Sequence, residues 1–523
     1  MPVAPTYPGV YIEEIPSGVR TITGVATSIT AFIGRARRGP ADSDGPVTIN
    51  SFGDFERVFG GLWTASTLGY AVRDFFLNGG GQAIIVRLVG STGTPGEIDL
   101  KAGADMLFLV AANAGEWGNN LSATIDHKTK DPANAKLFNL TILETDPITN
   151  QIVNTEKFLN VSVDSMDARY IPRVLKDGSA LVRLKDGSAV PAASPDDTPT
   201  NPVVPTKATP AKGTNGVALD RNSFTGVGFA GLKRGLYALE KADLFNLLCI
   251  PPYKNDGNVD AALVGDATVY CEKRRAMMLV DPPVEWDTVA EVIGDGATTG
   301  IAIVGTSSKN AAFFFPRLKQ SNPLHDNQIE EFVPCGAVAG VFARTDTQRG
   351  VWKAPAGLDA TLVGVPQLAV SLTDEENGQL NPLGINCLRA MTGAGRVIWG
   401  SRTLQGNDRL ASEWKYVPVR RTALYIEESL YRGTQWVVFE PNDEPLWAQI
   451  RLNVGAFMHN LFRQGAFQGI SPKDAYFVKC DKETTTQNDV NLGIVNIVVG
   501  FAPLKPAEFV ILKLQQMAGQ IET

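Results

Sequence analysis

The sequence predicts a mixed α/β protein with an inserted, mainly β region and an extended strand at each end. Three observations support this fold class. From Leu232 onward short apolar runs alternate with helical patterns, residues 105–225 are polar and rich in strands, and both ends of the chain read as strands without a partner nearby. Alternating strands and helices favour βαβ units and a mainly parallel sheet with both faces covered.

The two ends of the chain are the strands without a local partner. Near the N-terminus Tyr7–Ile15 and Val19–Ile29 read as two extended stretches, and near the C-terminus residues 506–514 form another, set off by Pro503 and Pro506. A free strand presents unpaired N–H and C=O groups along its edges, so it seeks a partner sheet. If the partner lies in another copy, the ends couple the subunits of a polymer. The alternative is that they pair within their own chain.

The next part of the chain predicts two helices and one strand. Ile49–Gly60 and Leu68–Leu77 carry apolar residues at helical spacing. The glycines at 79–81 stop the second helix, since glycine tolerates the left-handed turn that follows helix ends. Gln82–Val89 is a short and nearly continuous apolar run, which is typical of a strand buried on both faces.

Residues 105–225 differ in composition and predict a β domain inserted into the chain. Leu137–Leu143 alternates apolar with polar residues, as a half-buried strand does. The sequence Lys-Asp-Gly-Ser-Ala occurs at 176–180 and again at 185–189, and Asp-Gly between apolar positions favours tight hairpin turns. Residues 195–216, rich in Pro, Thr and Ala, are expected to form a linker or a long exposed loop.

The second half of the chain predicts strands and helices in alternation. Buried strands are expected at Leu244–Ile250, Ala276–Val280 and Ala311–Pro316, with a helix at Val259–Arg274. Together they predict the main parallel sheet.

A long helix is expected at Leu446–Phe467, because Pro445 can occupy its first turn without losing a hydrogen bond. After it, residues 475–480 and 493–499 read as a pair of antiparallel strands. Seven apolar residues of the helix form one stripe: Trp447, Ile450, Val454, Phe457, Met458, Leu461 and Phe462.

The composition limits the classes of function. The chain has 523 residues, 44% hydrophobic and 20% charged, as folded proteins do, and its net charge of −7 argues against nucleic acid as a partner. Its five cysteines stand singly, which suits buried reduced thiols, and no spacing of metal ligands or cofactor motif is complete. The N-terminal residues do not resemble a secretion signal, and the longest apolar stretch, Leu492–Leu504, is too short to span a bilayer. We therefore expect assembly in the cytoplasm, without membrane insertion.

Two segments resemble parts of enzyme sites. Gly226–Gly231 spells the dinucleotide-binding pattern, but the polar residues 220–223 precede it instead of the strand that the mechanism needs. Gly305–Ser308 is similar to the serine motif of subtilisin-type proteases, whose serine needs a histidine base. The only histidine upstream is His127, inside the inserted region. A hydrolase or nucleotide-binding enzyme remains the alternative interpretation, without a complete site.

Several segments, in order along the chain, resemble contractile tail sheath proteins, the family found in contractile phage tails, tailocins and related injection systems. The resemblance covers both ends and most of the chain from about residue 230 onward, but not the inserted region. The matching segments are Tyr7–Ile15, Val338–Asp346, Arg349–Ala356, Gly384–Asn386, Val397–Leu404, Val419–Arg421, Phe439–Asn442, Leu446–Trp447 and Pro506–Phe509.

The resemblance implies a fold: a subtilisin-like α/β domain without catalytic residues, a C-terminal α+β sheath domain, an inserted mainly-β outer domain, and extended arms. The expected boundaries are a linker arm at 1–25, the first part of the core at 26–104, the outer domain at 105–225, the α/β domain at 226–384, the tube-facing domain at 385–505 and the C-terminal strand arm at 506–523.

The resemblance also implies an activity without enzyme chemistry or a cofactor. Copies form a helical sheath around an inner tube, and on a signal from the baseplate the sheath contracts and drives the tube through a target cell envelope. The implied partners are other copies of the chain, the inner tube protein, and baseplate and tail terminator or cap proteins. The particle is a phage tail, a tailocin or another injection system, including particles released from the cell.

The family's strand exchange assigns roles to residues at both ends. The donated N-terminal stretch is either Val10–Ile15 or Val19–Val25, and the donated C-terminal stretch is Glu508–Leu514. Both add strands to the C-terminal domain of a neighbour. The expected arm residues are Val10, Tyr11, Ile12, Ile15, Val19, Ile22, Phe509, Val510, Ile511 and Leu512. The expected acceptor edge contains Tyr476, Val478, Ile494, Ile497 and Val499, and the expected tube contacts are Arg451, His459 and Arg463.

Overall fold

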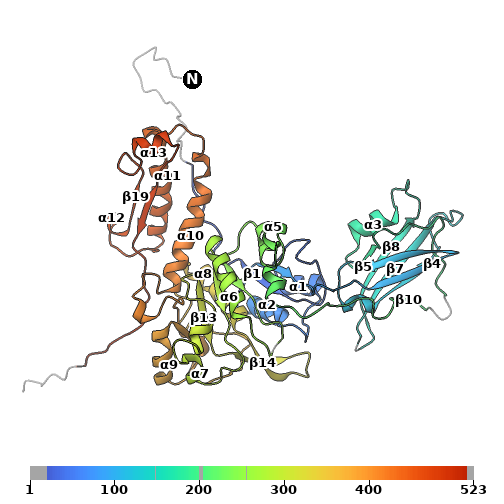
Figure 1. The fold of residues 1–523 in the computed structure, drawn as a ribbon, viewed down its shortest axis with the longest axis horizontal. Coiled ribbons are helices and arrows are strands. Elements are labelled where there is room, and N and C mark those ends of the chain that lie inside the picture. Colours follow the sequence, from blue (N-terminus) through green and yellow to red (C-terminus); the bar gives the residue numbers. More distant parts are fainter. Residues whose placement is uncertain (1–19, 148, 200–203, 255, 515–523) are drawn as a thin grey trace, which may run out of the picture. The chain divides into compact units, whose positions relative to one another are not determined.

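The computed structural model describes residues 20–147, 149–199, 204–254 and 256–514, which divide into two compact units (Figure 1). The sheet unit consists of Ser28–Arg344 and Ala356–Ser412. The C-terminal unit consists of Thr345–Pro355, with Met1–Thr27 and Glu413–Thr523 as far as these are described. No helix in the described ranges is both long and apolar enough to cross a membrane.

An eight-stranded sheet is the centre of the sheet unit, in the order β18-β17-β13-β12-β11-β1-β3-β2. The runs predicted as buried strands form its centre, because parallel strands covered on both faces need apolar residues on both. The parallel strands are β1 (Thr30–Gly34), β3 (Ala83–Arg87), β11 (Leu247–Cys249), β12 (Met277–Val280), β13 (Ala311–Phe315) and β17 (Ile385–Met391). The antiparallel edges are β2 (Val47–Ile49) and β18 (Gly395–Ile398).

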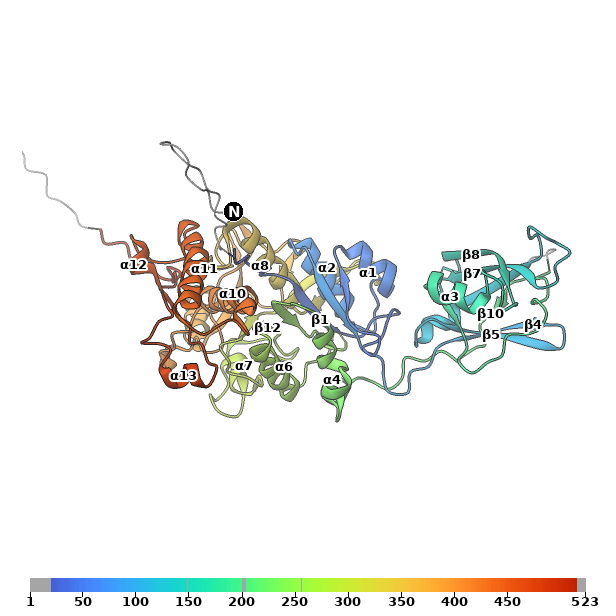
Figure 2. The ribbon, with the colours of Figure 1, turned by 90° about the horizontal axis from the view of Figure 1, so that it is seen from above.

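Helices cover both faces of this sheet (Figure 2). On one face Phe32 of β1 meets Phe75 of α2, and Phe314 of β13 meets Phe342 of α8. On the other face Ala31 and the neighbouring strands pack against α6 in the main apolar core. The helices are α1 (Phe52–Phe59), α2 (Leu68–Leu77), α4 (Arg221–Thr225), α5 (Phe229–Leu232), α6 (Ala261–Lys273), α7 (Val289–Ile293), α8 (Cys335–Arg349) and α9 (Asp374–Leu380). A small antiparallel sheet joins β14 (Leu318–Asn322) to β15 (Gln328–Phe332) and β16 (Gln367–Leu368).

The close approach of α8 to α2 depends on glycine. A Cβ atom at Gly336 would lie 2.0 Å from the carbonyl oxygen of Ala71, and one at Gly340 would lie 2.5 Å from that of Phe75. The two helices therefore pack backbone against backbone, which fixes α8 on the sheet.

Between β3 and α4 the chain forms two antiparallel sheets around an apolar core of its own. One has the order β4-β5-β9, with β4 (Glu97–Ala102), β5 (Asp105–Ala111) and β9 (Val182–Leu184). The other has the order β10-β6-β7-β8, with β6 (Leu121–Asp126), β7 (Leu137–Thr145), β8 (Ile152–Ser162) and β10 (Thr206–Lys207). Because β4 and β5 are paired, the region begins before β4 and not at the expected residue 105.

The two Lys-Asp-Gly-Ser-Ala repeats do not both form turns. The first lies at the end of α3 (Ile171–Gly178), so the predicted hairpin turn there is wrong. The helix forms because Ile171 and Leu175, one turn apart, are both buried in the apolar core. The second repeat follows β9 and contains a turn, with Gly187 at φ 75°, but it does not join two adjacent strands of a hairpin.

The C-terminal unit is built on two long helices, α10 (Val417–Gly433) and α11 (Glu444–Arg463). The predicted apolar stripe of α11 is confirmed, since Trp447, Ile450, Val454, Phe457, Met458 and Leu461 are buried and Phe462 is partly buried. The expected boundary at residue 385 is wrong, because β17 pairs with β13 in the main sheet. The remaining elements are α12 (Pro472–Ala475), β19 (Tyr476–Lys479), α13 (Gln487–Asn491) and β20 (Val498–Phe501).

Candidate functional site

Residues 20–27 are attached to the helices of their own C-terminal unit. The backbone N–H of Arg20 donates to Asn453 Oδ1 at 3.1 Å, and that of Val25 donates to Ser429 Oγ at 3.2 Å. Ile22 is only 7% exposed and belongs to the apolar core of the unit, and no strand forms before Thr30 in the described part. The expectation that Ile22 lies in a free strand is therefore wrong: its side chain is in its own core. Val10, Tyr11, Ile12, Ile15 and Val19 lie outside the described residues.

A buried ion pair fixes the end of this segment. The Arg421 guanidinium donates to both carboxylate oxygens of Asp346, at 2.8 and 2.6 Å, and to the carbonyl oxygen of Thr27 at 2.8 Å. Both side chains of the pair are 3% exposed. Paired charges in such a dry site hold their geometry firmly, so Thr27 has a fixed position against α10.

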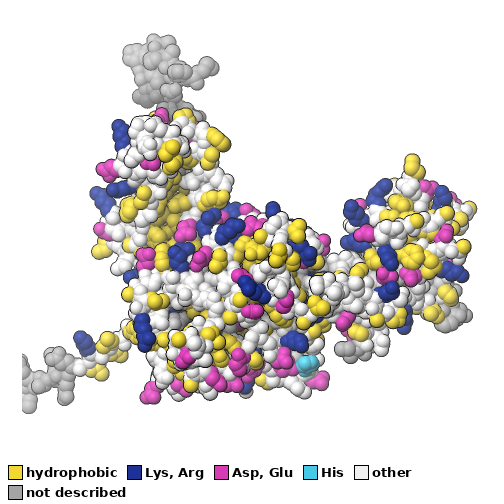
Figure 3. All heavy atoms as spheres, in the orientation of Figure 1, with side chains coloured by type: hydrophobic (Ala, Val, Ile, Leu, Met, Phe, Trp, Pro, Cys, Tyr) yellow, Lys and Arg dark blue, Asp and Glu magenta, His cyan; other side chains and the backbone are white. Residues whose placement is uncertain are grey.

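The C-terminal segment from 506 to 514 lies outside the fold of the unit. Phe509, Val510, Ile511, Leu512 and Leu514 are between 74% and 97% exposed, and no strand forms there. Figure 3 shows hydrophobic side chains of this segment exposed at the surface, beside a basic side chain. A run of exposed apolar residues is unfavourable in water and usually marks a surface that a partner covers.

Glu508 is the point at which this segment is attached to the unit. Its carboxylate accepts a hydrogen bond from the Tyr416 hydroxyl at 3.1 Å and lies 3.9 Å from Lys415 Nζ. The sequence pattern did not distinguish this anchor from the exposed residues that follow it, because both belong to one extended run.

The strands β19 and β20 form a sheet of only two strands. Tyr476, Val478 and Val499 lie against the apolar core, while Phe477 and Val498 are 50% and 44% exposed. An isolated two-stranded sheet is marginal in water, and further strands would stabilise it. This sheet is the best candidate for an acceptor within the described chain.

The expected acceptor edge is only partly made of strand. Tyr476, Val478 and Val499 lie in β19 and β20, whereas Ile494 and Ile497 precede β20. At Ile494 the backbone still bonds to α13, since its N–H donates to the carbonyl oxygen of Asp489 at 2.8 Å. Beside Ile497, the N–H of Asn496 donates to Thr485 Oγ1 at 3.0 Å and not to β19.

The three expected tube contacts differ in their surroundings. Arg451 is engaged within the unit, pairing with Glu444 at 2.6 Å and donating to the carbonyl oxygen of Cys480. The ring of His459 lies 6.2 Å from that of Phe462 and 6.5 Å from that of Tyr476. Arg463 is exposed at the end of α11. The engagement of Arg451 makes it a structural residue of the unit, and the tube contact of all three remains a prediction.

The structure brings His127 to Ser194 and Asp197 and not to Ser307. His127 Nδ1 lies 2.7 Å from Asp197 Oδ1, and Nε2 lies 2.7 Å from Ser194 Oγ. The Ser194 hydroxyl also lies 2.9 Å from the carbonyl oxygen of Ala135, and its single hydrogen cannot serve both neighbours. The Asp197 side chain is 64% exposed, unlike the buried aspartate of a catalytic triad. These contacts hold the loop that contains Ser194 and Asp197 against the end of β6.

The glycines at 226–231 do not form a nucleotide-binding turn. They follow α4, where the mechanism requires a strand, and the helix after them, α5, has only four residues. No group of three metal-ligating side chains occurs among the residues that the structure describes.

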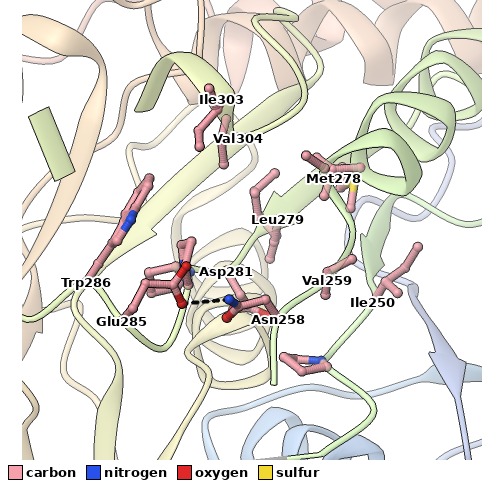
Figure 4. A pocket seen from close by; sticks show the side chains of 16 residues that line it. Ile250, Asn258, Val259, Met278, Leu279, Asp281, Glu285, Trp286, Ile303 and Val304 are labelled. Atoms are coloured by element: carbon pink, nitrogen blue, oxygen red, sulfur yellow. Dashed lines mark hydrogen bonds between the residues drawn. The ribbon is translucent and has the colours of Figure 1, made fainter. Parts of the chain in front are cut away.

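A pocket of about 170 Å³ lies at the carboxyl ends of β11 and β12 (Figure 4). Asn258 donates to Glu285 at 2.7 Å beside Asp281, while Met278, Ile303 and Val304 form apolar walls. Asp281 Oδ1 accepts from the N–H of Cys335 at 2.8 Å, and its buried Oδ2 has no hydrogen-bond partner among the described residues. Burial raises the pKa of this carboxyl to about 7. The pocket combines two acids with apolar walls, and no serine, threonine, cysteine, lysine or histidine is among the described residues that line it.

Comparisons with known proteins agree with this architecture. The model of the phage tail sheath protein central domain matches residues 225–404, and that of the phage tail sheath C-terminal domain matches residues 411–517, together more than half of the chain. The tail sheath protein of Burkholderia phage BcepMu is 26% identical over 55% of this chain, and the alignment spans 59% of that protein's length. The tail sheath protein of Enterobacteria phage T4 is 26% identical over 32% of this chain and 24% of its own.

Solved structures share the fold. The anti-feeding prophage helical sheath in its contracted state has a TM-score of 0.57 and 23% identity, covering 98% of this chain and 100% of its own. The sheath tail protein Lin1278 from Listeria innocua has a TM-score of 0.60 and 15% identity, covering 92% of this chain and 96% of its own. The chain belongs to the contractile tail sheath protein family.

Proposed function

We propose that this chain is the structural subunit of a contractile sheath, which polymerises helically around an inner tube and drives that tube through a target cell envelope. The observation that carries the proposal is the coexistence, in one unit, of an apolar extended segment outside the fold and a sheet of only two strands. The extended segment can be donated as a strand, and the two-stranded sheet can accept one. Joining them between copies satisfies both, and repeating the contact in one direction generates a helical polymer.

The C-terminal arm begins after its anchor at Glu508, and Phe509 to Leu512 are the residues that add to the β19–β20 sheet of another copy. Backbone hydrogen bonds supply the strength of such an addition, and alternate side chains determine its register. At the other end, the burial of Ile22 favours 10–15 over 19–25 as the donated stretch. Residues 20–27 then serve as the fixed root of that arm.

Contraction requires two packings of the same subunits. Each subunit moves as a rigid body between two packings that differ by roughly a few kcal/mol. Because the copies are linked, these differences add along the sheath. The energy is stored at assembly, so the mechanism needs neither a bound nucleotide nor an enzymatic step.

The units take different places in this assembly. The sheet unit is a subtilisin-like α/β domain used as a scaffold, and the insertion between β3 and α4 faces outward. The C-terminal unit faces the tube, with Arg463 and His459 among its contacts. Baseplate and terminator or cap proteins contact the two ends of the sheath. The particle assembles in the cytoplasm as a phage tail or as an injection particle.

Replacing the apolar arm residues tests this function. A double variant, Phe509→Ser with Ile511→Ser, changes two exposed side chains, so the subunit should remain folded but should no longer form sheaths in negative-stain electron microscopy. Lys513→Ser is the matched control on the same segment and should assemble normally. Sheaths of normal length from the double variant would refute the coupling.

A further inference from the structure

Phe439 is an exposed aromatic residue in a strained conformation. Its side chain is 102% exposed relative to the reference state, and its backbone φ is 70°. The left-handed region is unfavourable for a residue with a bulky side chain, at a cost of roughly 1–3 kcal/mol. Water exposure of the ring adds a second unfavourable term. Such a combination persists only if the surrounding structure imposes it.

The loop around Phe439 is held at both ends. Across Phe439, the N–H of Glu440 donates to the carbonyl oxygen of Val437 at 3.1 Å. After it, Asn442 accepts from the indole N–H of Trp447 at 2.9 Å and donates to the carbonyl oxygen of Ile494 at 3.0 Å. Trp447 is 5% exposed and part of the apolar core. The loop is therefore fixed in a conformation that presents the Phe439 ring to solvent.

Other exposed apolar side chains belong to the same region. We define the Phe439 patch as Val438, Phe439, Leu492 and Ile494, whose side chains are 64%, 102%, 66% and 42% exposed. The Asn442 bond joins the two stretches, and Ile494 leads directly toward Val498, the first residue of β20. Val498 pairs with Lys479 at one end of the β19–β20 sheet, and the stretch that contains Ile494 joins the sheet at this end. A strand added to the sheet therefore has one of its own ends there, near the patch.

We propose that the Phe439 patch receives apolar side chains of the C-terminal arm of a second copy, at the end of the β19–β20 sheet where Val498 lies. This inference rests on the proposed strand addition, and it adds the side-chain contacts that would make the sheet bind this arm specifically. The chemistry of the two surfaces matches: the arm offers exposed apolar residues interrupted by Lys513, and the patch is apolar and flanked by the exposed acids Glu440 and Asp443. An aromatic anchor with a charged rim is typical of interface hot spots.

Cross-linking in the full-length chain tests the contact directly. All five native cysteines are buried, so Phe439→Cys combined with Ile511→Cys supplies two accessible thiols. A short bismaleimide reagent should convert assembled protein into a ladder of covalent multimers on a denaturing gel. Val498→Cys with Ile511→Cys tests strand addition alone, and Val227→Cys with Ile511→Cys, on an exposed loop of the sheet unit, measures random collisions.

The outcomes separate this inference from the function on which it rests. A ladder from the 498/511 pair but not from 439/511 would overturn the inference and keep strand addition. No ladder above the 227/511 background from either pair would overturn strand addition itself. A cross-link within single chains at 439/511 would contradict the role of a second copy.

A glycine substitution distinguishes an interface role from a structural one. Phe439→Gly removes the ring and relieves the backbone strain, so the thermal stability of the unassembled chain should stay the same or rise. The concentration needed for sheath formation should nevertheless increase about 10- to 100-fold, the usual effect of losing a hot-spot side chain. Phe439→Leu should assemble nearly normally. Unchanged assembly of the glycine variant would show that the ring is not an anchor.

Discussion

Replacing Arg421 by Met should strongly destabilise the C-terminal unit. Arg421 donates two hydrogen bonds to Asp346 and one to Thr27, and the ion pair is almost completely buried. Methionine fills much of the same space but leaves the Asp346 carboxylate without its charge partner. Leaving one buried charge unpaired costs about 3–5 kcal/mol. Because Thr27 loses its donor as well, the N-terminal root should also loosen.

Urea unfolding measures this loss. Four of the eight tryptophans, Trp352, Trp414, Trp436 and Trp447, lie in the C-terminal unit and four in the sheet unit. Tryptophan fluorescence therefore reports on both units, and the variant should shift the part of the transition that comes from the C-terminal unit. With a slope of about 2–3 kcal/mol per molar urea, the midpoint should fall by about 1–2 M. Amide hydrogen exchange at residues 20–27 should accelerate at the same time.

Two further variants test the electrostatic reasoning. Arg420→Met removes a neighbouring buried arginine that lies over the Trp414 ring, but its carboxylate partner Glu427 is 44% exposed. No buried charge is left unpaired, so the loss of stability should be clearly smaller than that of Arg421→Met. Adding Asp346→Leu to Arg421→Met replaces the buried pair by apolar groups and should recover much of the loss. A single Arg421→Met variant within 1 kcal/mol of the parent protein, or a double variant no better than the single, would refute the argument.

Three other changes test the helix packing, the pocket acid and the insertion. Gly336→Ala should destabilise the sheet unit by about 1–3 kcal/mol in thermal or urea unfolding, because the new Cβ collides with the backbone of α2. Gly378→Ala, in a helix where a Cβ meets nothing, should be neutral or stabilising, and equal effects would contradict the packing. Since burial raises the pKa of Asp281 to about 7, its contribution to stability is complete below about pH 4 and is lost as the pH rises toward 7. Asp281→Asn should therefore show a flatter stability profile over this range and greater stability than the parent protein at pH 8, and an unchanged profile would count against burial of the charge. Thr94 and Thr214 exchange backbone hydrogen bonds of 3.1 and 2.9 Å, so replacing everything between them by a short glycine turn should leave a folded subunit that still forms sheaths in electron micrographs. Loss of assembly would show that the insertion links copies.

The local sequence pattern was sufficient to predict the elements that are completely buried, because only one kind of secondary structure can bury such apolar runs. Apolar runs such as Ala311–Pro316 became central strands because only a sheet covered on both faces can bury them completely. The pairing of β17 with β13 could not be predicted, because it joins residues that are far apart in the sequence. The two identical five-residue repeats make the same point, because one ends a helix and the other forms a turn. Their neighbours, not their own residues, decide between the two.

The candidate site was predictable in kind but not in detail. An alternating apolar stretch fits a free strand and a segment packed on helices equally well, so the sequence could not distinguish the buried Ile22 from the exposed Ile511. Nor does a pattern reveal strain: Phe439 looks like an ordinary core aromatic until its φ and exposure are known. Both properties depend on tertiary contacts, here those of Asn442 and Arg421.

The parts proposed to join copies all belong to the C-terminal unit. Arg421 fixes the root of the N-terminal arm, Glu508 anchors the C-terminal arm, and the β19–β20 sheet lies on the same apolar core. A unit that contains both donors and the acceptor can keep its links to other copies as long as its own core stays intact. The contacts of the sheet units can then differ between the two packings of the sheath without breaking any strand addition. In the proposed mechanism, connectivity and contraction are therefore carried by different units of the chain.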